Sequence, residues 1–171
     1  MPSVISEFAE YLWILIFFLL QTTLCARYKI FGVVPNLVLV FAVSAFAVNS
    51  IPRSAFLAVF AGLMLDWSAG RAGVNALLLL YLSLLVSYAS EKFFYKRLVY
   101  IVILTFAADI LYSVFYLALN FYIWGVFVNF QSFMRVIIQA SVDTVLSVIC
   151  YFAYVKYKNR ENIKLSFKKD V

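Results

Sequence analysis

Long apolar runs dominate the chain, separated by short connections that contain polar residues, glycine or proline. A helix that crosses the roughly 30 Å hydrocarbon core of a bilayer needs about 20 residues, at a rise of about 1.5 Å per residue. The pattern therefore predicts an all-α fold, a polytopic membrane bundle that forms a single integral membrane domain over residues 1–171. Its six predicted transmembrane helices cover residues 8–26, 35–49, 54–67, 73–90, 97–120 and 136–155.

Two segments depart from a simple crossing. Residues 54–67 would form a helix of roughly 21 Å, which is short for a bilayer. This segment is expected to thin the bilayer locally, to lie protected inside the bundle, or to be partly re-entrant. Residues 121–133, FYIWGVFVNFQSF, are rich in aromatic side chains and poor in charge. They are expected to lie in the membrane interface, because Trp and Tyr settle at headgroup level.

Composition and charge strengthen the membrane interpretation. The chain is 66% hydrophobic and 13% charged, which excludes an ordinary soluble domain. Ten of its 14 Lys and Arg residues lie on one side of the predicted bundle, so both termini are expected in the cytoplasm. Residues 156–171 are predicted to be a basic cytoplasmic tail near anionic membrane lipids. The net charge of +6 does not predict nucleic-acid binding, because no soluble basic surface is available.

The inventory of reactive side chains argues against catalysis. The chain has no histidine, and Cys25 and Cys150 have no neighbours at metal-ligand spacing. We find no nucleophile–histidine pair, no glycine-rich phosphate loop and no recognised aspartyl protease motif. The sequence therefore predicts no catalytic residue, no metal site, no cofactor and no enzyme activity. A bound small molecule is not expected either.

One acid, Asp66, ends an otherwise apolar run at the third predicted helix. A charged group in hydrocarbon costs at least about 2.5 kcal/mol, so such an acid is a candidate functional residue. Ser54, Ala58 and Gly62 precede it at four-residue steps, which places three small residues and the acid on one helical face. That face suits either a partner or a neighbouring helix of the same protein, and the spacing alone favours internal packing.

Two further acids lie on polar stripes of the fifth and sixth helices. Asp109 follows Thr105 and precedes Ser113, while Asp143 follows Gln139 and precedes Ser147, all at four-residue steps. Both stripes are expected to face the bundle interior and to hydrogen-bond one another, rather than to form an ion pathway. Because Asp143 lies two turns from Arg135, its partner is expected on another helix.

The turn after Asp66 combines glycines with an asparagine. Gly70 and Gly73 permit the backbone to leave helical geometry, and Asn75 can hydrogen-bond backbone groups at the start of the fourth helix. An ordinary loop would explain the glycines but not the clustering of acid, glycines and asparagine. These residues predict an ordered turn in which Asp66 holds Asn75 in place.

The order of these motifs resembles the rod shape-determining protein MreD family. The resemblance rests on FGVVPNLVLV and AVFAGLMLDWSAGRAGVNALLLLY, in a chain of this length with a basic tail. The family pattern falls on seven residues: Pro35, Asn36, Gly62, Asp66, Gly70, Gly73 and Asn75. Beyond residue 91 the resemblance is one of hydropathy and helix number, so it gives Asp109, Gln139 and Asp143 no role beyond intramembrane packing.

The resemblance implies a multi-pass protein of the bacterial plasma (inner) membrane that acts without catalysis. Members of the family are similar in associating with the bitopic protein MreC. Through it they connect to the MreB filament and to RodA with the elongation penicillin-binding protein. The implied function is a scaffold that positions peptidoglycan synthesis and maintains rod shape.

A second hypothesis belongs to a different class. The same family is similar to the substrate-binding membrane components of energy-coupling-factor vitamin transporters. Those components carry an Ala-x-x-x-Ala face on their first helix, and YLWILIFFLLQTTLCA has no such face. An ion or proton channel is a third hypothesis, motivated only by the three aspartates.

Overall fold

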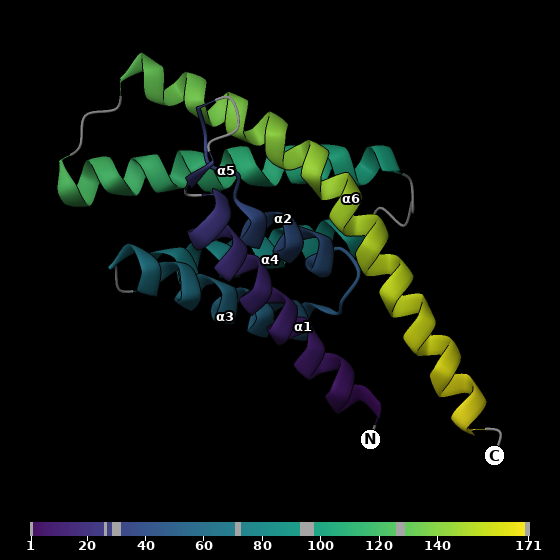
Figure 1. Cartoon of the computed structure of the whole chain (residues 1–171). Helices are drawn as coiled ribbons and strands as arrows, with labels where there is room; N and C mark the ends of the chain where they lie inside the picture. The colour runs from purple at the N-terminus through teal and green to yellow at the C-terminus, as the bar shows by residue number, and fades with distance from the viewer. Residues whose placement is uncertain are drawn as a thin grey trace.

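The computed structural model describes residues 2–25, 27–28, 32–70, 73–92, 98–125 and 129–169. Within these ranges the chain forms six α-helices and one π-helical turn (Figure 1), which confirms the all-α prediction. The elements are α1 (Pro2–Leu20), η1 (Gln21–Cys25), α2 (Leu37–Phe46), α3 (Ile51–Ala69), α4 (Val74–Lys92), α5 (Leu98–Trp124) and α6 (Phe130–Lys169). Helix α1 begins and α6 ends toward the same end of the molecule (Figure 1).

Three of these helices are long and apolar enough to cross a membrane. They are α4, the Tyr100–Ile123 part of α5 and the Gln131–Lys158 part of α6. The apolar parts of α1 and α2, Phe8–Thr23 and Leu37–Phe46, are shorter. Length and composition therefore make this a membrane protein, consistent with the sequence pattern.

The short helix is α2, not α3 as the sequence suggested. Helix α3 includes Ile51 and Pro52, which the predicted boundary omitted, and its 19 residues span roughly 28 Å. Helix α2 has only 10 residues, because Asn36 caps its start and a turn at residues 47–49 ends it. Pro35 therefore lies just before the helix rather than in its first turn.

The ends of α5 and α6 also correct the predicted boundaries. Helix α5 continues through residues 121–124 and α6 begins at Phe130, so much of the predicted interfacial segment is helical. Residues 126–128 lie outside the described ranges. The basic segment from residue 156 to 169 extends α6 without a break and is not a separate tail.

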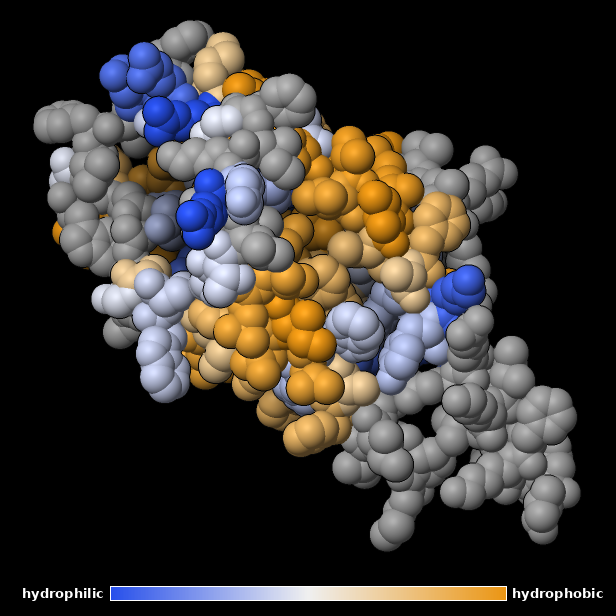
Figure 2. Space-filling view, in the orientation of Figure 1, coloured by the Kyte–Doolittle hydropathy of each residue, from blue (hydrophilic) through white to orange (hydrophobic). Residues whose placement is uncertain are grey.

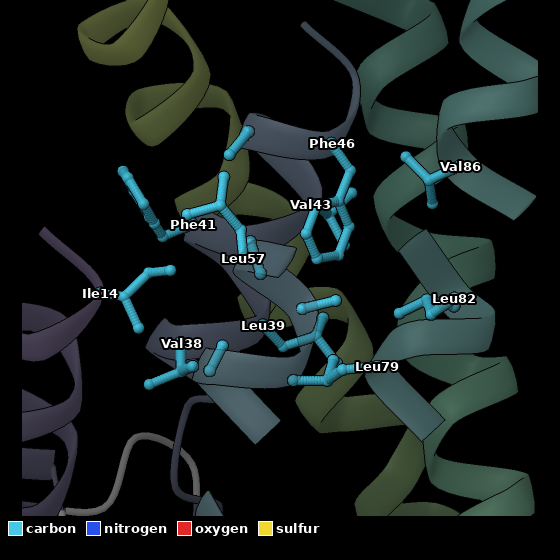
Figure 3. Close-up of a cluster of buried hydrophobic side chains, with 14 of the residues drawn as sticks. Ile14, Val38, Leu39, Phe41, Val43, Phe46, Leu57, Leu79, Leu82 and Val86 are labelled. Carbon is cyan, nitrogen blue, oxygen red and sulfur yellow. The ribbon is translucent and has the colours of Figure 1, made fainter. Parts of the chain in front are cut away.

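Helix α2 lies at the centre of the bundle. Its residues from Val38 to Phe46 are all buried, so it presents apolar side chains in every direction. Ile14 of α1, Leu57 of α3 and Leu79 of α4 join the same core (Figure 3). Because α2 is surrounded on all sides, its position and both of its ends are set by the helices around it.

The outer surface of the bundle is apolar where lipid would contact it. A continuous apolar area covers the middle of the face shown in Figure 2. Phe56 and Ile149 are 71% and 64% exposed, which would be costly in water but not in hydrocarbon. Trp67 and Tyr122 are more exposed still and lie near the ends of α3 and α5, where the amphipathic aromatic belt of a membrane protein is found.

Candidate functional site: two capped helix starts and a polar cavity

The side chain of Asp66 caps the N-terminal end of α4. Its Oδ1 accepts a hydrogen bond from the backbone N–H of Asn75 at 2.9 Å, and its Oδ2 accepts one from Ala76 at 3.0 Å. The first N–H groups of a helix have no partner within it, and the helix dipole favours negative charge there. With Asp66 only 3% exposed, these bonds offset the burial of the carboxylate. The prediction that Asp66 holds Asn75 in place is confirmed.

The role predicted for the Asn75 side chain is wrong. It does not bond backbone groups of the helix start, because Asp66 already accepts from those N–H groups. Instead, its Oδ1 accepts a hydrogen bond from the Tyr112 hydroxyl at 2.7 Å. Asn75 therefore ties α4 to α5, a contact that sequence spacing could not indicate.

The glycines adopt the conformations that the turn requires. Gly70 has φ +63° and is the C-cap of α3, where its N–H donates to the last turn of the helix. Gly73 has φ +79° and its carbonyl accepts from Leu77 at the start of α4. Side chains other than glycine rarely adopt such angles, so both positions favour glycine.

Gly62 brings α3 and α4 into backbone contact. A Cβ atom added at Gly62 would lie 2.2 Å from the Cα of Ala76 and 2.5 Å from its nitrogen. The Ser54, Ala58, Gly62 and Asp66 face is buried along its whole length. The predicted packing of this face inside the protein is therefore confirmed.

Asp143 binds the start of α2, but through one backbone N–H group rather than two. Its Oδ1 and Oδ2 accept from the backbone N–H of Asn36 at 3.0 and 3.1 Å. The Oδ1 of Asn36 accepts from Leu39, and the Oε1 of Gln21 accepts from Val38 at 3.0 Å. The partner of Asp143 thus lies outside its own helix, as predicted. The capping role of Gln21 was not predicted, because a glutamine at the end of an apolar run carries no such signal.

Asp109 and Asp143 join the two polar stripes, as predicted. Asp109 is completely buried on α5, and its carboxyl group interacts directly with that of Asp143 on α6. The hydroxyl of Thr105, one turn earlier, has no hydrogen-bond partner among the described residues. The two stripes face the interior and meet through Asp109 and Asp143 as expected, but Thr105 takes no part in this contact.

A cavity of about 380 Å³ lies next to the two capped helix starts. Asn36 and Asn75 line it, together with Tyr112 and Ser113 of α5 and Gln139 of α6. Arg135, in the second turn of α6, also lines it and is exposed. Its volume falls in the range of small-molecule sites, roughly 300–1,000 Å³. Three of the predicted site residues, Asn36, Asn75 and Gln139, therefore line one cavity.

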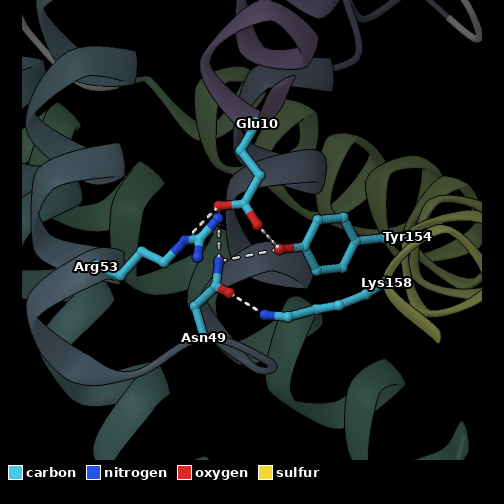
Figure 4. Close-up of polar contacts among 5 residues, drawn as sticks. All are labelled: Glu10, Asn49, Arg53, Tyr154 and Lys158. Carbon is cyan, nitrogen blue, oxygen red and sulfur yellow. Dashed lines mark hydrogen bonds and ion pairs between the residues drawn. The ribbon is translucent and has the colours of Figure 1, made fainter. Parts of the chain in front are cut away.

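A second polar cluster, missed by the sequence analysis, joins α1, α3 and α6 (Figure 4). Glu10 is 2% exposed; its Oε2 accepts from Arg53 at 2.9 Å and from Asn49 at 3.1 Å. Its Oε1 accepts from the Tyr154 hydroxyl at 2.6 Å, and Lys158 donates to Asn49. Glu10 lies in the first turn of the first predicted helix, and only the tertiary fold brings its three donors together.

We expect Glu10→Gln to lower the unfolding temperature of the purified protein. Three donors converge on the Glu10 carboxylate, and an amide would place a fourth donor among them. Hydrogen bonds to a charged group contribute about 1.5–3 kcal/mol, so we expect a loss of about 2 kcal/mol. Thermal unfolding in one detergent measures it. Glu91→Gln, at an exposed acid, is the control; an equal effect of both substitutions would refute the role of the cluster.

No family model, curated protein or solved structure matches the chain.

Proposed function

We propose that this protein is a non-enzymatic scaffold of the bacterial plasma membrane that associates with MreC and helps position peptidoglycan synthesis. In this proposal six helices cross the membrane and both termini lie in the cytoplasm. RodA, its penicillin-binding protein and the MreB filament are reached through MreC. The specific partners rest on the sequence resemblance to the MreD family.

The observation that carries the proposal is the structural role of the residues on which the resemblance rests. Asn36 caps α2, Asp66 caps α4, and Gly62 brings α3 into contact with α4. These residues form a rigid framework and leave no free acid at either helix start. Such a framework suits a protein that presents a fixed surface to partners better than one that performs chemistry.

The placement of the helix ends gives independent support to the proposed topology. Helix α1 begins and α6 ends at the same end of the bundle (Figure 1), as an even number of crossings requires. The basic residues of α6 between 156 and 169 extend from that end. Positive charge at that end agrees with a cytoplasmic location.

Deletion of the gene in its own host tests the proposal. We expect rod-shaped cells to become round, and a tagged copy of the chain to restore rods and to recover MreC on purification. Recovery of MreC should survive washing in salt, since the contact would lie in the membrane. Rods that persist after deletion, or a tagged protein that restores growth without recovering MreC, would contradict the proposal.

The cavity favours a second candidate, the substrate-binding component of an energy-coupling-factor-type transporter. A polar cavity inside a membrane bundle is the feature such a component needs. Helix α1 lacks the small-residue face that docks the coupling subunit in that class. Recovery of a paired ATP-binding subunit, together with stabilisation by one vitamin, would favour this function over the scaffold.

A further inference from the structure

The polar groups that line the cavity are mainly hydrogen-bond donors. Four amide side chains line it, and the NH₂ group of Gln139 donates to Asp143. The carbonyl oxygens of the other three are already occupied: Gln21 accepts from Val38, Asn36 from Leu39, and Asn75 from Tyr112. Their three NH₂ groups donate no hydrogen bond within the described ranges and are not enclosed by neighbouring atoms. These groups therefore face the cavity as donors.

The charge at the cavity has one sign. Arg135 is the charged side chain among its described lining residues, and it makes no ion pair within the described part of the chain. The nearby carboxylates, Asp66 and Asp143, are not among the lining residues. Asp66 accepts from two backbone N–H groups at the start of α4, and Asp143 accepts from one at the start of α2. Their charges are offset by the positive ends of α2 and α4.

The rest of the lining suits the boundary between headgroup and hydrocarbon. The rings of Tyr112 and Tyr116 are stacked, with centroids 6.0 Å apart, and Leu65 and Val136 add apolar surface. Arg135 and Ser68 are exposed, so the cavity is open at their side. A fitting ligand has an anionic group rich in acceptors, joined to an apolar part.

We propose that the cavity binds the phosphate of an anionic phospholipid headgroup, with Arg135 as the charged contact and the three amides as additional donors. Guanidinium matches the geometry of phosphate oxygens and forms two parallel hydrogen bonds with them. The membrane provides this chemistry as phosphatidylglycerol. A soluble glycerol phosphate carries the same group without acyl chains. The proposal does not depend on association with MreC.

The test uses the purified full chain in micelles of an uncharged maltoside detergent. Phosphatidylglycerol is titrated in one arm, glycerol 3-phosphate in the second, and diacylglycerol, which has the acyl chains but no phosphate, in the third. We expect phosphatidylglycerol to raise the unfolding temperature and diacylglycerol to leave it unchanged. Stabilisation by glycerol 3-phosphate as well would show that the phosphate group suffices, and its absence would show that the acyl chains contribute. Either result supports the site.

Arg135→Gln should weaken phosphatidylglycerol binding roughly ten- to hundredfold, the effect of removing a charge-assisted hydrogen bond. Arg27→Gln is the matched control, because Arg27 is also exposed but does not line the cavity. Ser68→Phe should weaken binding without a change of charge, because it fills the open side. The unfolding temperatures without lipid show whether each variant is folded.

Three results would overturn the proposal. The first is that neither phosphatidylglycerol nor glycerol 3-phosphate raises the unfolding temperature. The second is that diacylglycerol raises it as much as phosphatidylglycerol does. The third is binding that persists unchanged in both folded Arg135→Gln and Ser68→Phe.

Discussion

Gly62→Ala is expected to destabilise the protein strongly, although alanine is the better helix former by about 1 kcal/mol. The added Cβ would lie 2.2 Å from the Cα of Ala76 and 2.8 Å from the carbonyl carbon of Asn75. These are backbone atoms, so no side chain can rotate away. Helices α3 and α4 must separate, which stretches the hydrogen bonds from Asp66 to the start of α4. We expect a loss of about 3 kcal/mol, at the upper end for overpacked cores.

Unfolding of the purified variant in one detergent, by heat or by added denaturing detergent, measures this loss. Ala107→Val adds more volume at an exposed position of α5 and should leave the unfolding midpoint unchanged. The double variant Gly62→Ala with Ala76→Gly is more decisive. Since the contact is with the backbone of Ala76 and not with its methyl group, removal of that methyl should not restore stability. A restored midpoint would show that the contact has been described incorrectly.

Asp66→Ala is expected to destabilise the isolated protein and, as a result, to impair any assembly it takes part in. The substitution leaves the N–H groups of Asn75 and Ala76 without their acceptors at a buried helix start. A buried donor that loses its partner costs about 1–3 kcal/mol, and two are lost here. The tie from Asn75 to Tyr112 should weaken as the start of α4 frays.

Two measurements separate a structural effect from a lost partner contact. The first is the unfolding midpoint of the isolated protein, with Glu91→Ala as an exposed acid control that should change nothing. The second is MreC recovered per folded molecule in cells, which we expect Asp66→Ala to leave unchanged while the amount of folded protein falls. A variant with a normal midpoint and reduced recovery of MreC would instead make Asp66 a partner contact. The 3% exposure of Asp66 argues against that result.

The sequence predicted the existence of the helices well and their ends less well. Apolar runs identify helices in a membrane, because hydrocarbon leaves the backbone no other partners for its hydrogen bonds. Helix α2 was predicted too long because Ala47 and Val48 continue its apolar pattern, although the chain turns there. Helix α3 was predicted too short because Pro52 read as a boundary rather than as part of the first turn.

The candidate site was predicted in part. The four-residue spacing from Ser54 to Asp66 contained enough information to place an acid and a glycine on one buried face. It could not show that the Asp66 carboxylate would accept hydrogen bonds from backbone N–H groups of α4 rather than from a partner protein. Asp143 and Asp109 have similar sequence surroundings, yet only Asp143 accepts from the start of a helix, while Asp109 interacts with Asp143 itself. The difference depends on which helix start lies opposite each carboxylate.

The sequence by itself determined the membrane environment, the fold class and the residues with special backbone requirements. Hydropathy indicated a membrane, four-residue spacing marked the packed face of α3, and glycine marked the left-handed ends of the turn. Only the tertiary structure decided which polar groups meet. It placed Asp143 of α6 at the start of α2, more than 100 residues away, and it gathered three amide donors and Arg135 around one cavity. Hydrogen bonds between helices depend on their relative positions, and local spacing contains no information about those positions.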